Sequence, residues 1–306
     1  MTELKEKCGV FGIYGPGLDV SRLTFYGLYA LQHRGQESSG IAVGNGALIN
    51  CHKNVGLVNQ IYSEERIKSL KGFLAIGHNR YSTSEGTGLL HAQPVVAGDG
   101  LLALAHNGNL PSVTGLQNFL QSKGVEISKK NDSELMAEAI VYYLREGVDL
   151  KTAITKVFPL FTGAFSLLLA TKDALVALRD ACGIRPLAMG KLNNNVVFAS
   201  ESCAFHVVGA EFVREVNPGE MIIVTGSGVE SVQIQPAKPK FDLFEFVYFA
   251  RPDSNILGKS VYQVRRNCGT RLAREYSIQA DMVIPVPETA VPVAVGYAEA
   301  SGIPLE

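Results

Sequence analysis

The sequence predicts an α+β fold in two parts: a strand-rich sandwich with helices in pairs up to residue 235, and the start of an α/β domain over residues 236–306. Three observations lead to this prediction. Short apolar runs typical of strands, such as residues 164–170, dominate the later half of the first part. The segment QPAKPK at 235–240 has two prolines, two lysines and no apolar periodicity, which indicates a linker. Beyond it, strand and helix patterns alternate, as in parallel α/β units.

The first part opens with a buried strand at residues 8–14. A helix follows, because apolar residues recur there at helical spacing, at Leu23, Tyr26, Gly27, Ala30 and Leu31. The polar loop 32–40 comes next. Further strands are expected at residues 41–44, 47–52, 73–79 and 101–106.

Two more helices are expected in the middle of the chain. One begins near Pro111, since proline is favoured in a first helical turn. The other begins after NDSE (131–134) and has an apolar stripe at Met136, Ala139, Ile140 and Tyr143. Strands follow at 165–170, 175–178, 196–199 and 221–224. Beyond the linker, strands are expected at 245–249 and 281–286, and helices around Val261, Val264, Cys268 and Leu272 and over 289–300.

Composition excludes several classes of protein. The chain has 306 residues and a net charge of -1, so it offers no general field for nucleic acid or an anionic membrane. Its apolar runs are too short to span a bilayer, and residues 1–7 lack the apolar centre of a secretory signal, so we expect a cytoplasmic location. The five cysteines show no close spacing, which predicts neither disulfides nor a zinc site. We expect four of them to be core residues: Cys51, Cys182, Cys203 and Cys268.

Cys8 is the candidate nucleophile. It follows a short polar leader, and cleavage after Lys7 would give it a free α-amino group. Such a group titrates at about 7.7–8.0, so it can act as a base for the thiol of the same residue. The alternative is a buried cysteine that merely starts a strand, and position alone favours that alternative.

Two motifs end apolar strands and offer groups for a substrate. Arg80, in GHNRYST, suits bidentate binding of a small carboxylate, although an isolated arginine is usually a surface residue. Asn107 and Gly108, in HNGN, can supply the side-chain amide and backbone N–H of an oxyanion hole. The alternative for this pair is a simple turn.

Asp132 is the third candidate. Its carboxylate could hold the ammonium group of an amino acid, or it could only serve a helix start, because Asn131 and Glu134 resemble a capping box. Taken together, the motifs predict attack of a thiol on an amide, an oxyanion hole, and a grip on an α-amino acid. That substrate would be glutamine, and the reaction would be acyl transfer through a thioester with release of ammonia.

Five motifs in this order, CGVFGIYG, LQHRGQESSGIA, GHNRYST, LAHNGNL and NDSE, resemble the glutaminase domain of the amidophosphoribosyltransferase family. The stretches FVYFARPDS (246–254) and VIPVPETA (283–290) resemble its phosphoribosyltransferase half. The resemblance implies an αββα N-terminal-nucleophile (Ntn) hydrolase sandwich at 8–235, a propeptide at 1–7, and an incomplete type I phosphoribosyltransferase domain at 236–306. It also implies the first committed step of purine synthesis.

The resemblance also implies roles for single residues. Cys8 would be the nucleophile and base, with Asn107 and Gly108 as the oxyanion hole. The residues implied for glutamine binding are Arg80, Asp132 and Arg34. Tyr81 and Arg251 would couple the two active sites. Thr289 would contact Mg²⁺ bound to phosphoribosyl pyrophosphate, and we expect a homo-oligomer.

Two departures from the family pattern limit these expectations. The sequence contains no Asp-Asp pair, although the family's phosphoribosyl pyrophosphate fingerprint has two adjacent acids. We therefore expect a fragment or truncated product that is competent only for the glutaminase half. Asp242 stands where many members have a cluster-ligating cysteine, so no iron–sulfur cluster is expected. The alternatives are another Ntn amidotransferase of the aminosugar-synthase type, or a non-catalytic regulatory relative.

Overall fold

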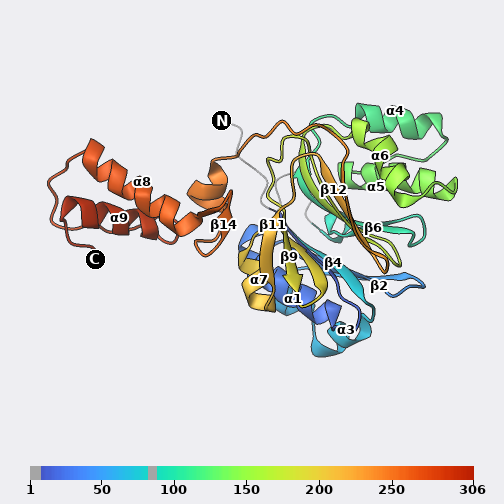
Figure 1. Cartoon of the computed structure of the whole chain (residues 1–306), viewed down its shortest axis with the longest axis horizontal. Helices are drawn as coiled ribbons and strands as arrows, with labels where there is room; N and C mark the ends of the chain where they lie inside the picture. Colours follow the sequence, from blue (N-terminus) through green and yellow to red (C-terminus); the bar gives the residue numbers. More distant parts are fainter. Residues whose placement is uncertain (1–7, 82–87) are drawn as a thin grey trace. The chain divides into compact units, whose positions relative to one another are not determined.

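A computed structural model describes residues 8–81 and 88–306, and the described chain divides into two compact units (Figure 1). The first unit comprises the described residues up to Ser200 together with Ala204–Phe241. The second comprises Glu201–Cys203 and Asp242–Glu306. The predicted leader, residues 1–7, and Ser82 and Thr83 of the GHNRYST motif lie outside the described residues. None of the described helices is long and apolar enough to cross a bilayer.

Two antiparallel sheets form the centre of the first unit. One sheet has the strand order β11 (Glu211–Glu215), β9 (Ala188–Leu192), β10 (Asn195–Ala199), β1 (Gly9–Tyr14), β4 (Leu74–Arg80), β2 (Ser38–Gly44) and β3 (Ile49–Val55). The other has the order β13 (Gly228–Gln233), β12 (Glu220–Thr225), β8 (Leu175–Arg179), β7 (Ala164–Ala170), β6 (Leu102–Asn109) and β5 (Val95–Ala97). Their facing sides pack as one apolar layer that includes Val10, Ile76, Ala105 and Leu168.

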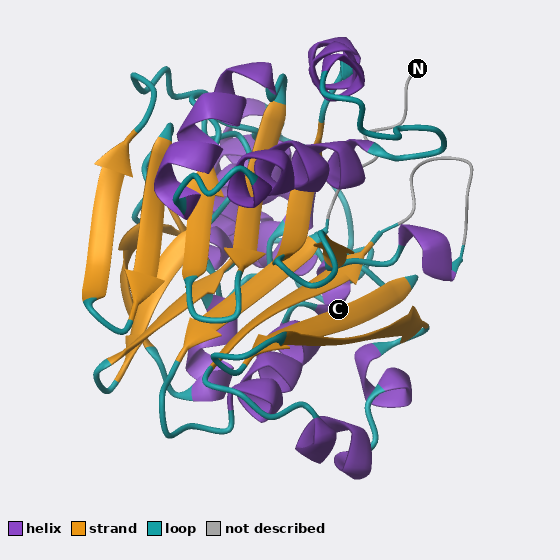
Figure 2. Ribbon diagram, turned by 90° about the vertical axis from the view of Figure 1, so that its right-hand side faces the viewer, coloured by secondary structure: helices purple, strands orange, loops and turns teal. Residues whose placement is uncertain are grey.

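Helices cover the outer faces of both sheets, which gives an αββα sandwich (Figure 2). On the second sheet lie α4 (Thr114–Ser122), α5 (Asp132–Arg145) and α6 (Leu150–Val157). On the first sheet, α1 (Val20–Ala30) packs so closely that a Cβ at Gly27 would overlap the ring of Phe11. The shorter helices are α2 (Val58–Ile61), α3 (Glu64–Ser69), α7 (Cys203–Val208) and the 3₁₀ turns η1 (Gln32–Arg34), η2 (Leu89–His91) and η3 (Phe158–Leu160).

The predicted strands of the first unit are confirmed, and so is the buried stripe of α5 at Met136, Ala139 and Ile140. One helix starts later than predicted: α4 begins at Thr114, three residues after Pro111. Pro111 instead packs against Gly163, and a Cβ at position 163 would overlap the proline ring.

The second unit contains a π-helical turn η4 (Glu245–Phe249), a small hairpin of β14 (Asn255–Ile256) and β15 (Lys259–Ser260), and the helices α8 (Val261–Glu275) and α9 (Val291–Ser301). The two helices lie side by side (Figure 1) and approach closely at Gly269 and Gly296, where a Cβ would overlap backbone of the other helix. The core cluster of this unit is Phe246, Ala250, Ile256 and Val261.

Three predictions for the second unit are wrong. Residues 245–249 are helical, because the buried positions 245, 246 and 249 follow a helical spacing rather than alternation. Residues 281–286 pair only through an isolated bridge between Val283 and Leu305, since the described chain offers them no partner strand of greater length. Cys268 is exposed, because α8 turns Arg265 and Gly269 inward instead.

Candidate active site

Cys8 directly precedes β1, a central strand of the first sheet. Val10 and Tyr14 of β1 face the layer between the sheets. Side chains alternate along a strand, so Cys8, two residues before Val10, is also turned toward the second sheet. The side chain of Arg34 is completely buried, and its Nε donates a hydrogen bond of 3.2 Å to the carbonyl oxygen of Cys8. Arg34 therefore holds the backbone at the candidate nucleophile.

Arg80 ends β4, the neighbour of β1. Gly9 pairs with Asn79, so the next step of the register puts Cys8 beside Arg80. Arg80 Nε donates to Glu37 Oε2 at 3.3 Å, and Arg80 Nη1 donates to the His91 carbonyl at 2.9 Å. Its side chain is 14% exposed, so Arg80 is not a surface arginine.

Asn107 lies in β6, whose residues Ala103 and Ala105 face the first sheet. The alternation therefore turns Asn107 into the same layer. Asn107 is completely buried, and neither its Nδ2 nor its Oδ1 has a hydrogen-bond partner among the described residues. Buried polar atoms are normally paired, so an unpaired amide in this position is a candidate ligand contact.

Gly108 is paired within β6, so the HNGN motif is strand and not the simple turn considered from sequence. Its φ is +150°, and a Cβ would overlap the carbonyl oxygen of Ala164. Only glycine fits there without strain. The end of β6 is tied to β4, because His78 Nε2 lies 3.0 Å from the carbonyl oxygen of His106.

Asp132 is the first residue of α5, but it does not cap the helix. The cap is Asn131, whose Oδ1 accepts from the Glu134 N–H at 3.0 Å while Glu134 Oε2 accepts from the Asn131 N–H at 2.8 Å. Asp132 Oδ2 instead accepts from the Leu110 N–H at 3.3 Å. This contact brings Asp132 to the end of the strand that carries Asn107.

The two histidines at the site are neutral for the same reason. Burial lowers the pKa of His78 to about 3. Burial also lowers the pKa of His106, with Arg185 acting in the same direction and Asp132 opposing it. Because a carbonyl oxygen only accepts, the proton of neutral His78 must be on Nε2.

Sequence reasoning missed five residues that act on these groups. Four form hydrogen bonds with them, namely Glu37, His91, Gln93 and Ser133, and the charge of Arg185 lowers the pKa of His106. Glu37 could have been found, because it lies in the polar loop 32–40 that the sequence analysis marked. Ser133 could also have been found, because it lies in the NDSE motif beside Asp132. The remaining three carry no local signal, since their roles depend on contacts between distant segments.

Three predicted residues lie elsewhere. Tyr81 directly follows β4 and is 41% exposed. In the second unit, Arg251 Nη2 donates to Asp253 Oδ2 at 2.8 Å, and Thr289 lies half-buried in the turn before α9. The roles of all three stay predictions.

Magnesium is the cofactor implied for the second unit. Within residues 8–81 and 88–306, no group of three or more His, Cys, Asp and Glu side chains is arranged to hold a metal ion. The contact predicted for Thr289 is with Mg²⁺ carried by phosphoribosyl pyrophosphate rather than with a metal site built from protein side chains, so it stays a prediction.

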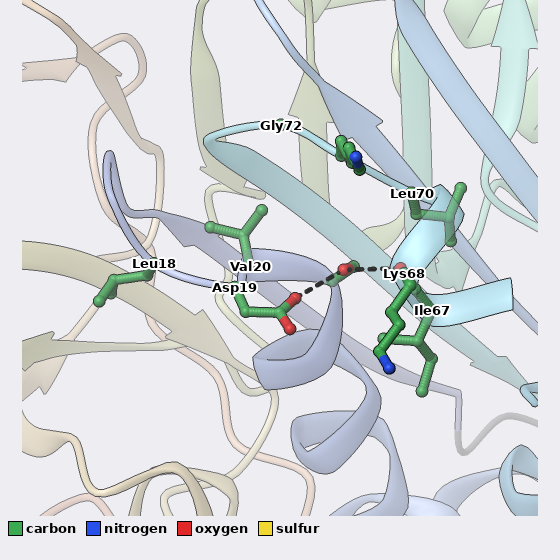
Figure 3. Close-up of a pocket in the computed structure, with 9 residues that line it drawn as sticks. Leu18, Asp19, Val20, Ile67, Lys68, Leu70 and Gly72 are labelled. Atoms are coloured by element: carbon green, nitrogen blue, oxygen red, sulfur yellow. Dashed lines mark hydrogen bonds between the residues drawn. The ribbon is translucent and has the colours of Figure 1, made fainter. Parts of the chain in front are cut away.

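A separate pocket of about 470 Å³ lies between the start of α1 and the end of α3 (Figure 3). Its polar groups bond to one another: Ser21 Oγ donates to Asp19 Oδ1 at 2.9 Å and lies 3.1 Å from the Ile67 carbonyl. None of the predicted site residues lines it.

Comparisons with known proteins show which family the chain resembles. The model of the glutamine amidotransferase domain family matches residues 78–207. An amidophosphoribosyltransferase of Synechococcus elongatus is 45% identical over 98% of this chain and 62% of its own length. One of Methanocaldococcus jannaschii is 40% identical over 97% of this chain and 67% of its own length.

The chain belongs to the amidophosphoribosyltransferase family. A solved family member, the Bacillus subtilis glutamine phosphoribosylpyrophosphate amidotransferase complexed with ADP and GMP, superimposes with a TM-score of 0.90 at 40% identity, covering 98% of this chain and 65% of that one. The predicted fold class is thereby confirmed. The chain spans about three fifths of the length of the Synechococcus relative.

Proposed function

We propose that this chain hydrolyses glutamine at Cys8 and supplies the ammonia half of amidophosphoribosyl transfer. The observation that carries the proposal is Asn107. Its amide is completely buried, both polar atoms are unpaired among the described residues, and it faces the layer into which Cys8 is turned, which suits an oxyanion-hole donor.

In the proposed reaction, the thiol of Cys8 loses its proton to a base and its sulfur attacks the side-chain amide carbon of glutamine. Asn107 Nδ2 and the Gly108 N–H hold the resulting oxyanion. The C–N bond then breaks, and the nitrogen leaves as ammonia after it takes up the proton from the base. Water hydrolyses the thioester to glutamate and restores the thiol.

The base in this proposal is the α-amino group of Cys8, which requires removal of residues 1–7. Arg80 would bind the α-carboxylate of glutamine and Asp132 its ammonium group. Their charges suit these partners. Arg80 ends β4 beside Cys8, and Asp132 bonds to the Leu110 N–H at the end of the strand that carries Asn107.

For the whole protein, we infer transfer of this ammonia to phosphoribosyl pyrophosphate, which gives 5-phosphoribosylamine, glutamate and pyrophosphate. Two things support this inference: membership of the family, and the FVYFARPDS and VIPVPETA stretches of the second unit.

The test is glutamine hydrolysis by the full chain, with the mature N-terminus determined by mass spectrometry. We expect release of ammonia and glutamate that is abolished in Cys8→Ala. Activity that survives Cys8→Ala contradicts the nucleophile. Full activity with residues 1–7 still attached contradicts the α-amino base.

A further inference from the structure

A buried polar cluster lies between the end of β6 and the start of α5, and the proposed reaction does not use it. Its members are Gln93, His106 and Ser133, which are 8%, 2% and 2% exposed. His106 immediately precedes Asn107, and Ser133 immediately follows Asp132. The cluster therefore joins the proposed oxyanion hole to the proposed ammonium-binding carboxylate.

The direction of each hydrogen bond can be assigned from donor and acceptor chemistry. The backbone N–H of His106 can only donate, and it lies 2.7 Å from Gln93 Oε1. The other end of this amide is therefore the NH₂ group, which donates to Ser133 Oγ at 3.2 Å.

Ser133 Oγ has one proton and two lone pairs. Gln93 uses one lone pair. Asp132 Oδ1, at 3.3 Å, is a carboxylate oxygen that only accepts, so it takes the proton. In the contact of 3.0 Å between His106 Nδ1 and Ser133 Oγ, we assign the proton to Nδ1, which also lies 3.7 Å from Asp132 Oδ2.

This assignment fixes the tautomer of His106. Burial lowers the pKa of the ring, so it carries one proton, and that proton is on Nδ1. His106 Nε2 is consequently unprotonated. It is buried and has no partner among the described residues, and it lies 2.9 Å from the point that a Cβ of Gly108 would occupy.

We propose that Gln93, His106 and Ser133 are positioning residues, which form a relay that orients the carboxylate of Asp132 relative to Asn107 and so sets the affinity for the ammonium group of glutamine. The substrate named here rests on the function proposed above. The relay is not needed to start α5, because Asn131 and Glu134 already cap that helix.

Ser133→Ala and Ser133→Cys test the relay in the full chain. Alanine removes the hydroxyl, and cysteine nearly keeps the volume but bonds weakly. Hydrogen bonds to charged groups contribute enough that we expect KM for glutamine to rise about tenfold in both variants, with kcat within about twofold of the parent. The matched control is Ser21→Ala, because Ser21 is also 2% exposed and its hydroxyl also bonds to a carboxylate, that of Asp19.

The kinetic outcomes separate the two proposals. The relay is overturned if KM for glutamine is unchanged in the Ser133 variants. It is also overturned if KM and kcat change in these variants by the same factors as in Ser21→Ala. Either result leaves the glutaminase proposal intact. An unmodified chain that hydrolyses no glutamine contradicts the glutaminase proposal instead.

A second measurement does not depend on activity. In ¹⁵N NMR of the full chain, the imidazole signal that disappears in His106→Gln should show a proton on Nδ1, and Ser133→Ala should move that proton to Nε2 in a detectable fraction. A ring protonated on Nε2 in the unmodified chain overturns the assignment, whatever the kinetics show.

Discussion

Replacing Asn107 with leucine should affect stability and activity in opposite directions. Leucine has nearly the same shape but no polar atoms, and both polar atoms of Asn107 are buried without a partner among the described residues. Each such atom costs roughly 1–3 kcal/mol of desolvation, so removing them should raise the free energy of unfolding by about 1–3 kcal/mol after imperfect packing is allowed for. Loss of one oxyanion donor should lower kcat by about 10²–10³.

Asn79→Leu is the matched control. Asn79 is also completely buried, in the adjacent first sheet, but its Nδ2 donates to the Leu28 carbonyl at 2.7 Å. Its replacement removes this bond and leaves the Leu28 carbonyl with only the Leu31 N–H, at 3.0 Å, so it should destabilise the protein.

The assays are urea unfolding of both variants and steady-state hydrolysis of glutamine by Asn107→Leu. If Asn107→Leu is destabilised as much as Asn79→Leu, the amide has a structural role. If its kcat is unchanged, Asn107 does not hold the oxyanion.

Three further predictions concern neighbouring residues. Arg80→Lys should raise KM for glutamine about 10- to 100-fold, because lysine lacks the planar fork that binds a carboxylate; an unchanged KM in steady-state assays argues against this role. Burial lowers the pKa of His78 from 6.5 to about 3, so the unfolded chain takes up the proton first. The free energy of unfolding should then be at its full value above about pH 6.5 and fall by up to about 1.4 kcal/mol per pH unit below it. His78→Gln can still donate to the His106 carbonyl, so urea unfolding midpoints of this variant should fall less steeply with pH. Equal pH slopes for variant and parent contradict this reasoning. Gly108→Ala should destabilise by about 2 kcal/mol or more, since alanine is strained at a φ of +150°, and an unchanged melting temperature contradicts that reasoning.

The sequence alone determined the strands of the sandwich and the stripe of α5, because these follow from local periodicity of apolar residues. Predictions from sequence failed in segments that are too short to show a clear periodicity of apolar residues. Residues 245–249 contain too few turns to distinguish helix from strand, and residues 281–286 are apolar but have only Leu305 beside them in the described chain.

The candidate site divides in the same way. Cys8, Arg80, Asn107 and Asp132 could be chosen from sequence, because each stands at a recognisable boundary of a strand or helix. Sequence could not decide whether Asn107 was turn or strand.

Only the tertiary structure decided which groups meet. The register of β1 against β4 puts Cys8 beside Arg80, and the contact of His78 with the His106 carbonyl joins the two sheets at that end. The partners of Ser133 come from segments up to 40 residues away in sequence. Such contacts depend on how strands pair and sheets stack, and local patterns do not encode them.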